Sequence, residues 1–122
     1  MNPHAGEGGV LGGEEAAEIL PAVEKARRAG INISDPIPPD VVFRRALDRP
    51  KAVVIALYHD QGLIAFKLLA FETGVNVSLG LPFVRTSPDH GTAFDIAGRN
   101  SADPASLVEA LRLARRLAAA SL

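Results

Sequence analysis

The stretch Ala52–Gly62, AVVIALYHDQG, decides how this sequence is interpreted. Its first seven residues are continuously apolar and rich in β-branched side chains, which is typical of a strand buried on both faces of a parallel sheet. Its last four are polar residues and a glycine, and open α/β sheets bind ligands at the carboxyl ends of such strands. The stretch therefore predicts a buried strand at Ala52–Tyr58 that leads into a polar, ligand-facing turn.

Helices are expected before this strand. Glu14–Ala29 begins with acidic residues and ends with basic ones, which suits the helix dipole, and Gly30 follows as a C-terminal stop. Pro21 lies inside this segment, so the helix should kink or split there. A shorter helix is expected to run from Asp40, acting as its cap, to Asp48.

After the strand, the sequence predicts a second strand at Val75–Leu79, a long polar loop at Gly80–Gly98 and a final helix. Asp103 should cap that helix, with Pro104 in its first turn. One apolar face of this helix is expected from the spacing of Leu107, Leu111, Ala114 and Ala118. The pattern predicts an α/β fold with mostly parallel buried strands and flanking helices.

Composition excludes several classes of function. The 122 residues (12.8 kDa) allow one domain and hardly more, and the absence of cysteine excludes disulfides, thiolate metal sites and cysteine nucleophiles. A net charge of −1, with one tyrosine and no tryptophan, disfavours a nucleic-acid or membrane-surface binder. Without a signal peptide or an apolar run of about 18 residues, the expected protein is soluble and cytoplasmic.

The three histidines are the first candidates for chemistry. His4, His59 and His90 each lie in a turn that is rich in glycine or acidic residues. Neutral imidazole is a common ligand of zinc and other divalent ions, whereas charged imidazole suits anions. A single loop histidine is more often a structural residue bonded to the backbone, and spacing alone does not prove a site.

Lys67, Asn76 and Arg85 form a second candidate group. Arginine offers a planar fork and lysine a point charge, which together suit a phosphate or a carboxylate. The alternative is an ordinary solvated surface, although Arg85 follows an apolar stretch. The glycine-rich opening could also hold an anion on free N–H groups, but Glu14 and Glu15 would compete for the same positive helix end.

Longer motifs then give a resemblance. Asn2–Gly9 (NPHAGEGG), Tyr58–Leu63 (YHDQGL) and Gly80–Ala93 (GLPFVRTSPDHGTA) closely resemble the 4-hydroxythreonine-4-phosphate dehydrogenase family of pyridoxal phosphate biosynthesis. Asp40–Phe43 is similar to that family's Pro-x-Asp-x-x-Phe helix start. The resemblance spans essentially residues 1–122 and corresponds to the carboxy-terminal portion of the family, with the upstream domain absent. It implies part of an isocitrate/isopropylmalate-dehydrogenase-like fold.

The resemblance also assigns roles to individual residues. His4 and His59 match two of three ligands of a divalent metal ion (zinc, magnesium or cobalt), and the third comes from the upstream part. Asp40, a catalytic candidate, matches an acidic residue near the metal. Asp60 is a second catalytic candidate that does not come from the resemblance: it follows His59 directly and could be the partner of that ligand histidine, and the alternative is a solvated turn aspartate. Lys67, Asn76 and Arg85 match substrate-binding positions. Binding of NAD or NADP is implied for His90, Gly91, Thr92 and Asp95.

The implied reaction is oxidation and decarboxylation of 4-phosphooxy-L-threonine, a small phosphorylated hydroxy-amino acid, in a homodimer with a shared active site. Two alternatives remain open: a sister-branch phosphothreonate or phosphoerythronate dehydrogenase, and an inactive remnant that only binds metal or anion or dimerises. Because only part of the site is present, the chain alone is expected to be inactive. The sequence departs from the family at Asp35, where glycine is usual, which adds a negative charge near the implied site.

Overall fold

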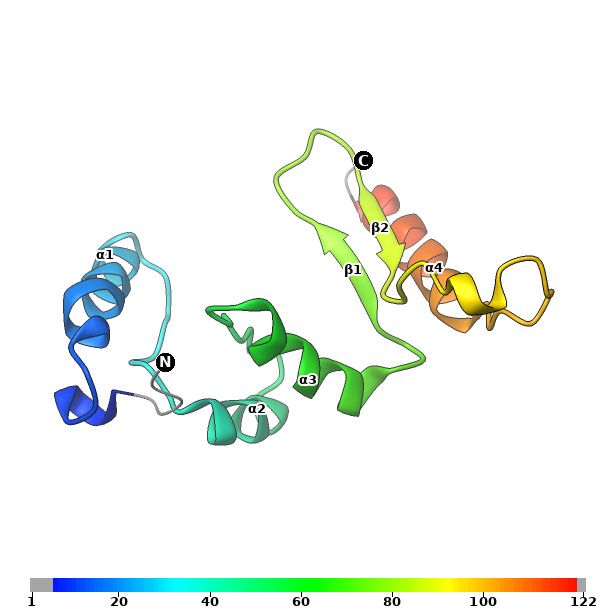
Figure 1. Ribbon diagram of the computed structural model, residues 1–122. Helices are drawn as coiled ribbons and strands as arrows, with labels where there is room; N and C mark the ends of the chain where they lie inside the picture. The colour runs from blue at the N-terminus through cyan, green and yellow to red at the C-terminus, as the bar shows by residue number, and fades with distance from the viewer. Residues whose placement is uncertain (1–5, 121–122) are drawn as a thin grey trace. The chain divides into compact units, whose positions relative to one another are not determined.

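The computed structural model describes residues 6–120, which fall into two compact units that divide between Leu57 and Tyr58. Figure 1 shows the elements along the chain. The first unit contains η1 (Glu7–Gly9), η2 (Glu15–Ile19), α1 (Leu20–Arg28) and α2 (Pro39–Leu47). The second contains α3 (His59–Ala70), β1 (Val75–Ser78), β2 (Arg85–Pro88), η3 (Phe94–Ile96) and α4 (Ala105–Ala120).

The predicted first helix is split at Pro21, as expected. The element η2 is a π-helical turn in which the Leu20 N–H bonds to the Glu15 carbonyl, and the regular helix α1 begins at Leu20. Proline has no N–H, and its ring would clash with the carbonyl four residues earlier, so a wider turn before it relieves the conflict. The buried side chain of this helix is Val23, at 5% exposure.

Gly30 ends α1, again as predicted. Its φ of 81° lies in the left-handed region, its N–H bonds to the Arg27 carbonyl, and the Ile31 N–H bonds to the Ala26 carbonyl. These two bonds define a Schellman motif, which satisfies carbonyls at the end of a helix.

The second helix forms where it was expected, but with a different cap. Helix α2 covers Pro39–Leu47, its N-cap is Pro38, and the N–H groups of Val41 and Val42 both bond to the Pro38 carbonyl. Asp40 therefore does not cap the helix. It lies in the first turn, where a carboxylate still interacts favourably with the positive end of the dipole.

The expected buried strand at Ala52–Tyr58 is not formed in the part of the chain that the structure describes. Residues 52–56 have no regular secondary structure, and Val53, Ile55 and Leu57 are exposed. A strand of a parallel sheet needs hydrogen-bonded neighbours and two covered faces, and residues 6–120 supply neither for this segment. Local composition indicated a strand, but a strand requires partners.

The second unit is built on an antiparallel ribbon, not on parallel strands. Strand β1 pairs with β2 in the register Val75↔Pro88, Asn76↔Ser87, Val77↔Thr86 and Ser78↔Arg85. The first strand was predicted to within one residue. The second lies inside the segment that was expected to be a loop, because its polar sequence gives no local strand signal and pairing with β1 decides its conformation.

Helix α4 packs on one face of this ribbon (Figure 1). Asp103 caps it as predicted, since the Ala105 N–H donates to the Asp103 Oδ1 over 2.9 Å. The buried face, however, is one residue earlier than expected and carries Ser106 and Ala110, while Leu107 and Leu111 are 47% and 63% exposed.

Close contact with the strands explains this shift of face. The Thr86 hydroxyl donates to the Ala110 carbonyl over 2.9 Å, and the buried residues on that face of the helix, Ser106 and Ala110, are both small. The Ser106 hydroxyl donates to the Gly74 carbonyl over 3.1 Å and accepts from the Asp89 N–H over 3.2 Å. One buried serine therefore holds the start of β1 and the end of β2 against α4.

The mixed α/β composition is confirmed, while the expected parallel arrangement is not seen among the described residues. None of the described helices is both long and apolar enough to cross a membrane.

Candidate functional site

The ribbon presents a polar face opposite α4. Strand residues alternate between faces, and the Thr86 contact places Val75, Val77 and Thr86 toward the helix. The opposite face carries Asn76, Ser78, Arg85 and Ser87. Two of the three residues predicted to bind substrate therefore share one face. Asn76 and Arg85 are diagonal neighbours across the register, a relationship that places side chains about 7–8 Å apart.

Arg85 is positioned by a residue that the sequence analysis did not single out. Its Nη1 donates to the Ser78 hydroxyl over 2.8 Å, which ties the guanidinium to the strand opposite. Arg85 is itself exposed, so its remaining donors are accessible to an anion. The alternation of Val75-Asn76-Val77-Ser78 is the signal that could have identified Ser78 as a neighbour of Asn76.

Lys67, the third of these residues, lies on α3 and is exposed. That helix begins with His59 and Asp60, two further candidates. His59 and Lys67 are eight residues apart, which is roughly 12 Å along a helix axis. The second unit thus carries His59 and Lys67 on helix α3, and Arg85 on strand β2 of the ribbon.

His59 and Asp60 form a contact that suits a metal ligand. The His59 Nδ1 lies 2.8 Å from the Asp60 Oδ1, and both side chains are more than 70% exposed. In the tautomer that carries its proton on Nδ1, the ring donates to the carboxylate and leaves the Nε2 lone pair open to solvent. Metal-binding histidines commonly make such a bond through the other ring nitrogen.

The structure does not place the other two proposed metal-site residues, His4 and Asp40, beside His59. His4 lies outside the described residues, and Asp40 lies in the first unit on α2. Within residues 6–120, no three His, Asp or Glu side chains come together as a metal site.

The segment implied to bind NAD or NADP is an exposed loop around η3. The His90 Nδ1 lies 3.0 Å from the Gly91 carbonyl, and Ala93 adopts a left-handed φ of 46° just before η3. Thr92 and Asp95 are exposed. These polar groups suit a nucleotide chemically, although their cofactor role stays a prediction.

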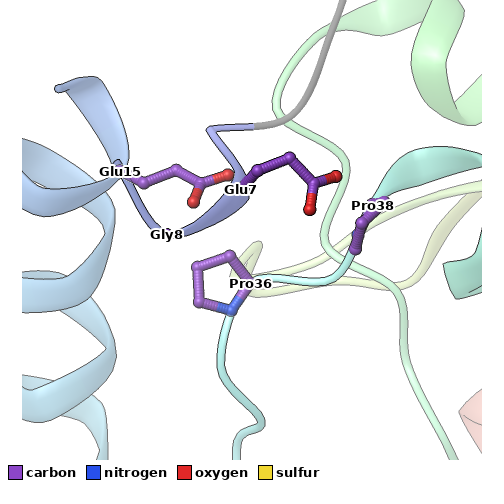
Figure 2. Close-up of a pocket in the computed structure, with 5 residues that line it drawn as sticks. All are labelled: Glu7, Gly8, Glu15, Pro36 and Pro38. Carbon is purple, nitrogen blue, oxygen red and sulfur yellow. The ribbon is translucent and has the colours of Figure 1, made fainter. Parts of the chain in front are cut away.

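The described part of the glycine-rich opening, residues 6–13, has an acidic rather than an anion-binding environment. The Gly6 N–H donates to the Glu15 Oε1 over 2.9 Å, so a carboxylate already occupies the donor. Figure 2 shows the carboxylates of Glu7 and Glu15 beside a hollow of about 140 Å³ that Gly8, Pro36 and Pro38 also line. Two carboxylates in so small a hollow disfavour an anionic ligand, as Glu14 and Glu15 indicated from the sequence.

The extra negative charge at Asp35 is also compensated. The Arg27 guanidinium donates to the Asp35 Oδ1 over 2.9 Å and to the Ile33 carbonyl over 3.1 and 3.2 Å. Because this pair is exposed, its contribution to stability is small. Its effect is to fix the turn that leads from α1 to α2.

The fold and the polar face define a mixed α/β protein in which one exposed arginine, Arg85, lies among neutral polar residues on the open face of the ribbon. Comparison with known proteins is more specific. The family model described as "Pyridoxal phosphate biosynthetic protein PdxA" matches residues 1–114, and the chain belongs to this family.

Several proteins are similar to the chain over most of its length. It is 59% identical to the 4-hydroxythreonine-4-phosphate dehydrogenase of Xanthobacter autotrophicus, covering 97% of this chain and 34% of the relative, and 58% identical to that of Aquifex aeolicus, covering 93% and 35%. The crystal structure of the Klebsiella pneumoniae enzyme matches with a TM-score of 0.79 at 49% identity, covering 93% of this chain and 34% of that one. The chain therefore spans about a third of the length of these relatives.

Proposed function

We propose that this chain forms the substrate-binding third of a dehydrogenase that oxidises and decarboxylates 4-phosphooxy-L-threonine with NAD or NADP in pyridoxal 5′-phosphate biosynthesis. The proposal includes the isocitrate/isopropylmalate-dehydrogenase-like fold of the whole enzyme and a homodimer with a shared active site. Membership of the family and the names of the relatives support it. The observation that carries it is the shared polar face of Asn76 and Arg85.

Arg85 is the residue best suited to hold the substrate's phosphate or carboxylate. The hydrogen bond to Ser78 already restricts the Arg85 side chain, so less conformational entropy is lost when an anion binds. The guanidinium is therefore partly preorganised. Asn76 adds an amide that can both donate and accept, which suits a hydroxyl or a carboxylate oxygen. Lys67 would add a second positive charge from α3.

His59 would be a ligand of a divalent cation through Nε2, with Asp60 fixing the ring. When bound, such a cation supplies Lewis-acid polarisation of the reacting oxygen. His4 is proposed as a further ligand. Asp40 is proposed to lie near the metal, and the loop His90–Asp95 is proposed to contact NAD or NADP.

A direct test uses the Xanthobacter autotrophicus relative, with its matched residues replaced by this chain so that the polypeptide has full length. Reduced cofactor is followed in the presence of 4-phosphooxy-L-threonine, NAD or NADP, and magnesium, zinc or cobalt. We expect turnover in the fused enzyme. Arg85→Ala should lower kcat/KM by roughly 10–100-fold, the loss expected for a hydrogen bond to a charged group.

Arg116→Ala is the matched control, since Arg116 is an exposed arginine on α4 away from the ribbon's polar face. It should leave kcat/KM unchanged. A fused enzyme that is folded but turns over only phosphothreonate or phosphoerythronate would assign the chain to the sister branch instead. Equal activity of Arg85→Ala and the unmodified enzyme would exclude the role given to Arg85.

A further inference from the structure

The hydrogen bond between Arg85 and Ser78 leaves the proton of the serine hydroxyl unused. A guanidinium has donors only, so in the 2.8 Å contact of the Arg85 Nη1 with the Ser78 Oγ the serine oxygen is the acceptor. The hydroxyl also carries one proton of its own. No hydrogen bond from this proton to another residue is seen within residues 6–120, so the proton is available to a bound molecule.

The cross-strand register determines where this proton lies. Ser78 and Arg85 are directly opposite each other on β1 and β2, on the face that points away from α4. Residues paired in this way have Cβ atoms about 4.5–5.5 Å apart. Because its Nη1 reaches the Ser78 hydroxyl, the long arginine side chain bends across the ribbon to the partner strand. The remaining guanidinium donors and the serine proton are therefore neighbours on one face of the second unit.

The charges on this face suit an anion. Its four strand residues are Asn76, Ser78, Arg85 and Ser87, which together carry one positive charge and no carboxylate. The guanidinium polarises the serine oxygen that accepts its hydrogen bond, and this makes the serine O–H a stronger donor. An anion that binds to both groups also offsets the charge of Arg85.

A phosphate group fits these donors better than a carboxylate does. The two oxygens of a carboxylate can both be bound by the parallel N–H groups of one guanidinium, which satisfies the ion without a hydroxyl. A phosphate monoester has three terminal acceptor oxygens, so one remains for a neighbouring donor. Arg85 and Ser78 together therefore match a phosphate more fully than Arg85 alone does.

We propose that Ser78 binds the phosphate group of the substrate directly: its hydroxyl accepts a hydrogen bond from Arg85 and donates its own proton to a phosphate oxygen. This inference rests on the proposed function, because it takes the anion to bind at Arg85. It gives Ser78 a role beyond orienting the arginine. A residue that only orients Arg85 acts through the guanidinium, whereas a residue that donates to phosphate still contributes when the guanidinium is absent.

A double-mutant cycle separates these two roles. Ser78→Ala is made in the fused full-length protein and in its Arg85→Ala variant, and the Kd of inorganic phosphate is measured by phosphorus NMR titration. In the unmodified background we expect Kd to rise roughly tenfold, as for the loss of a hydrogen bond to a charged group. In the Arg85→Ala background Kd should still rise by at least about threefold.

Ser78→Thr and Ser78→Val form a matched pair, because both new side chains are β-branched and only threonine carries a hydroxyl. Both residues suit a strand, so both variants should fold. The threonine variant should bind phosphate as the unmodified protein does, and the valine variant should bind it as weakly as Ser78→Ala. Ser101→Ala, at an exposed serine before α4, is the control and should leave the phosphate Kd unchanged.

Two results would overturn the proposal. One is a Ser78→Ala effect that disappears in the Arg85→Ala background, which would make Ser78 a positioning residue only. The other is equal phosphate affinity of the threonine and valine variants, which would show that the hydroxyl is not needed. Failure of the proposed function is seen separately: the fused protein then lacks turnover, or Arg85→Ala leaves phosphate affinity unchanged. The second of these outcomes would also remove the anion from Ser78.

Discussion

The Phe66 ring lies directly against Gly74, so that a Cβ at position 74 would overlap the ring and lie 2.8 Å from the Ala70 carbonyl oxygen. Gly74 is buried, and it joins the end of α3 to the start of β1. Glycine at this position lets the chain leave the helix and enter the ribbon within a few residues.

Gly74→Ala should therefore destabilise the second unit. The added methyl must displace the ring or the backbone, and overpacking of this kind costs about 1–3 kcal/mol. The measurement is the free energy of unfolding in urea. Gly13→Ala, at a glycine with open space around its Cβ direction, is the control and should change stability far less.

The Ser106 hydroxyl supports a second prediction. It bonds to the Gly74 carbonyl and the Asp89 N–H, so Ser106→Ala leaves two backbone groups without their partner. A buried unsatisfied group costs about 1–3 kcal/mol, and we expect a loss in that range by urea unfolding. Ser101→Ala, at an exposed serine before α4, should have little effect. Equal stability of the two variants would contradict the role given to Ser106.

Local signals predicted most of the helix ends. The proline inside the first helix, the Gly30 stop and the Asp103 cap all act within one turn of the chain, so their chemistry is visible in the sequence. They are confirmed. The cap at Asp40 was wrong by two positions, because Pro38 supplies the first helical carbonyl instead.

Strand formation and the buried face of α4 depend on residues far away in the sequence, so local sequence signals did not predict them. Ala52–Tyr58 has strand composition but no paired strand among residues 6–120, whereas Arg85–Pro88 lacks that composition and forms a strand through pairing. The buried face of α4 was predicted wrongly, because the hydrophobic pattern selects the face that carries leucines. Serine and alanine are less apolar, so the face that carries them was not chosen. Close packing on the ribbon selected Ser106 and Ala110.

The candidate site also combines features that local sequence predicts with features that depend on distant partners. The pairing register that places Asn76 and Arg85 on one face follows from alternation along β1 and β2, yet β2 had to be found first. Alternation along β1 could have placed Ser78 beside Asn76, but its bond to Arg85 depends on the pairing with β2. The assignments of His4, Asp40 and the His90–Asp95 loop come from resemblance alone, and they stay predictions.

Arg85→Lys should weaken anion binding even though the charge is kept. Lysine cannot reproduce the planar fork that bonds to Ser78 while presenting further N–H groups to an anion. With inorganic phosphate as the probe and calorimetry of the fused full-length protein, we expect Kd to rise roughly tenfold, about 1.4 kcal/mol. Arg116→Lys is the matched control. Identical phosphate affinity in the two variants would show that phosphate binds elsewhere.

Asp60→Asn tests the pair at the start of α3. The substitution keeps the size of the side chain and removes the carboxylate that lies 2.8 Å from the His59 Nδ1. Loss of such a partner typically lowers metal affinity 10–100-fold, because the ring is less well oriented and its free nitrogen is a poorer donor. Cobalt affinity of the fused full-length protein, followed by visible absorption, is the readout.

The controls separate this effect from a general change of charge. Asp48→Asn removes another exposed carboxylate, which pairs with Arg44 at the end of α2, and it should leave cobalt affinity unchanged. His59→Ala should lower affinity more than Asp60→Asn does, because it deletes the ligand and not its partner. If the two aspartate variants bind cobalt equally, Asp60 does not orient a metal ligand. If His59→Ala also binds as tightly, His59 is a surface histidine with a neighbouring carboxylate and nothing more.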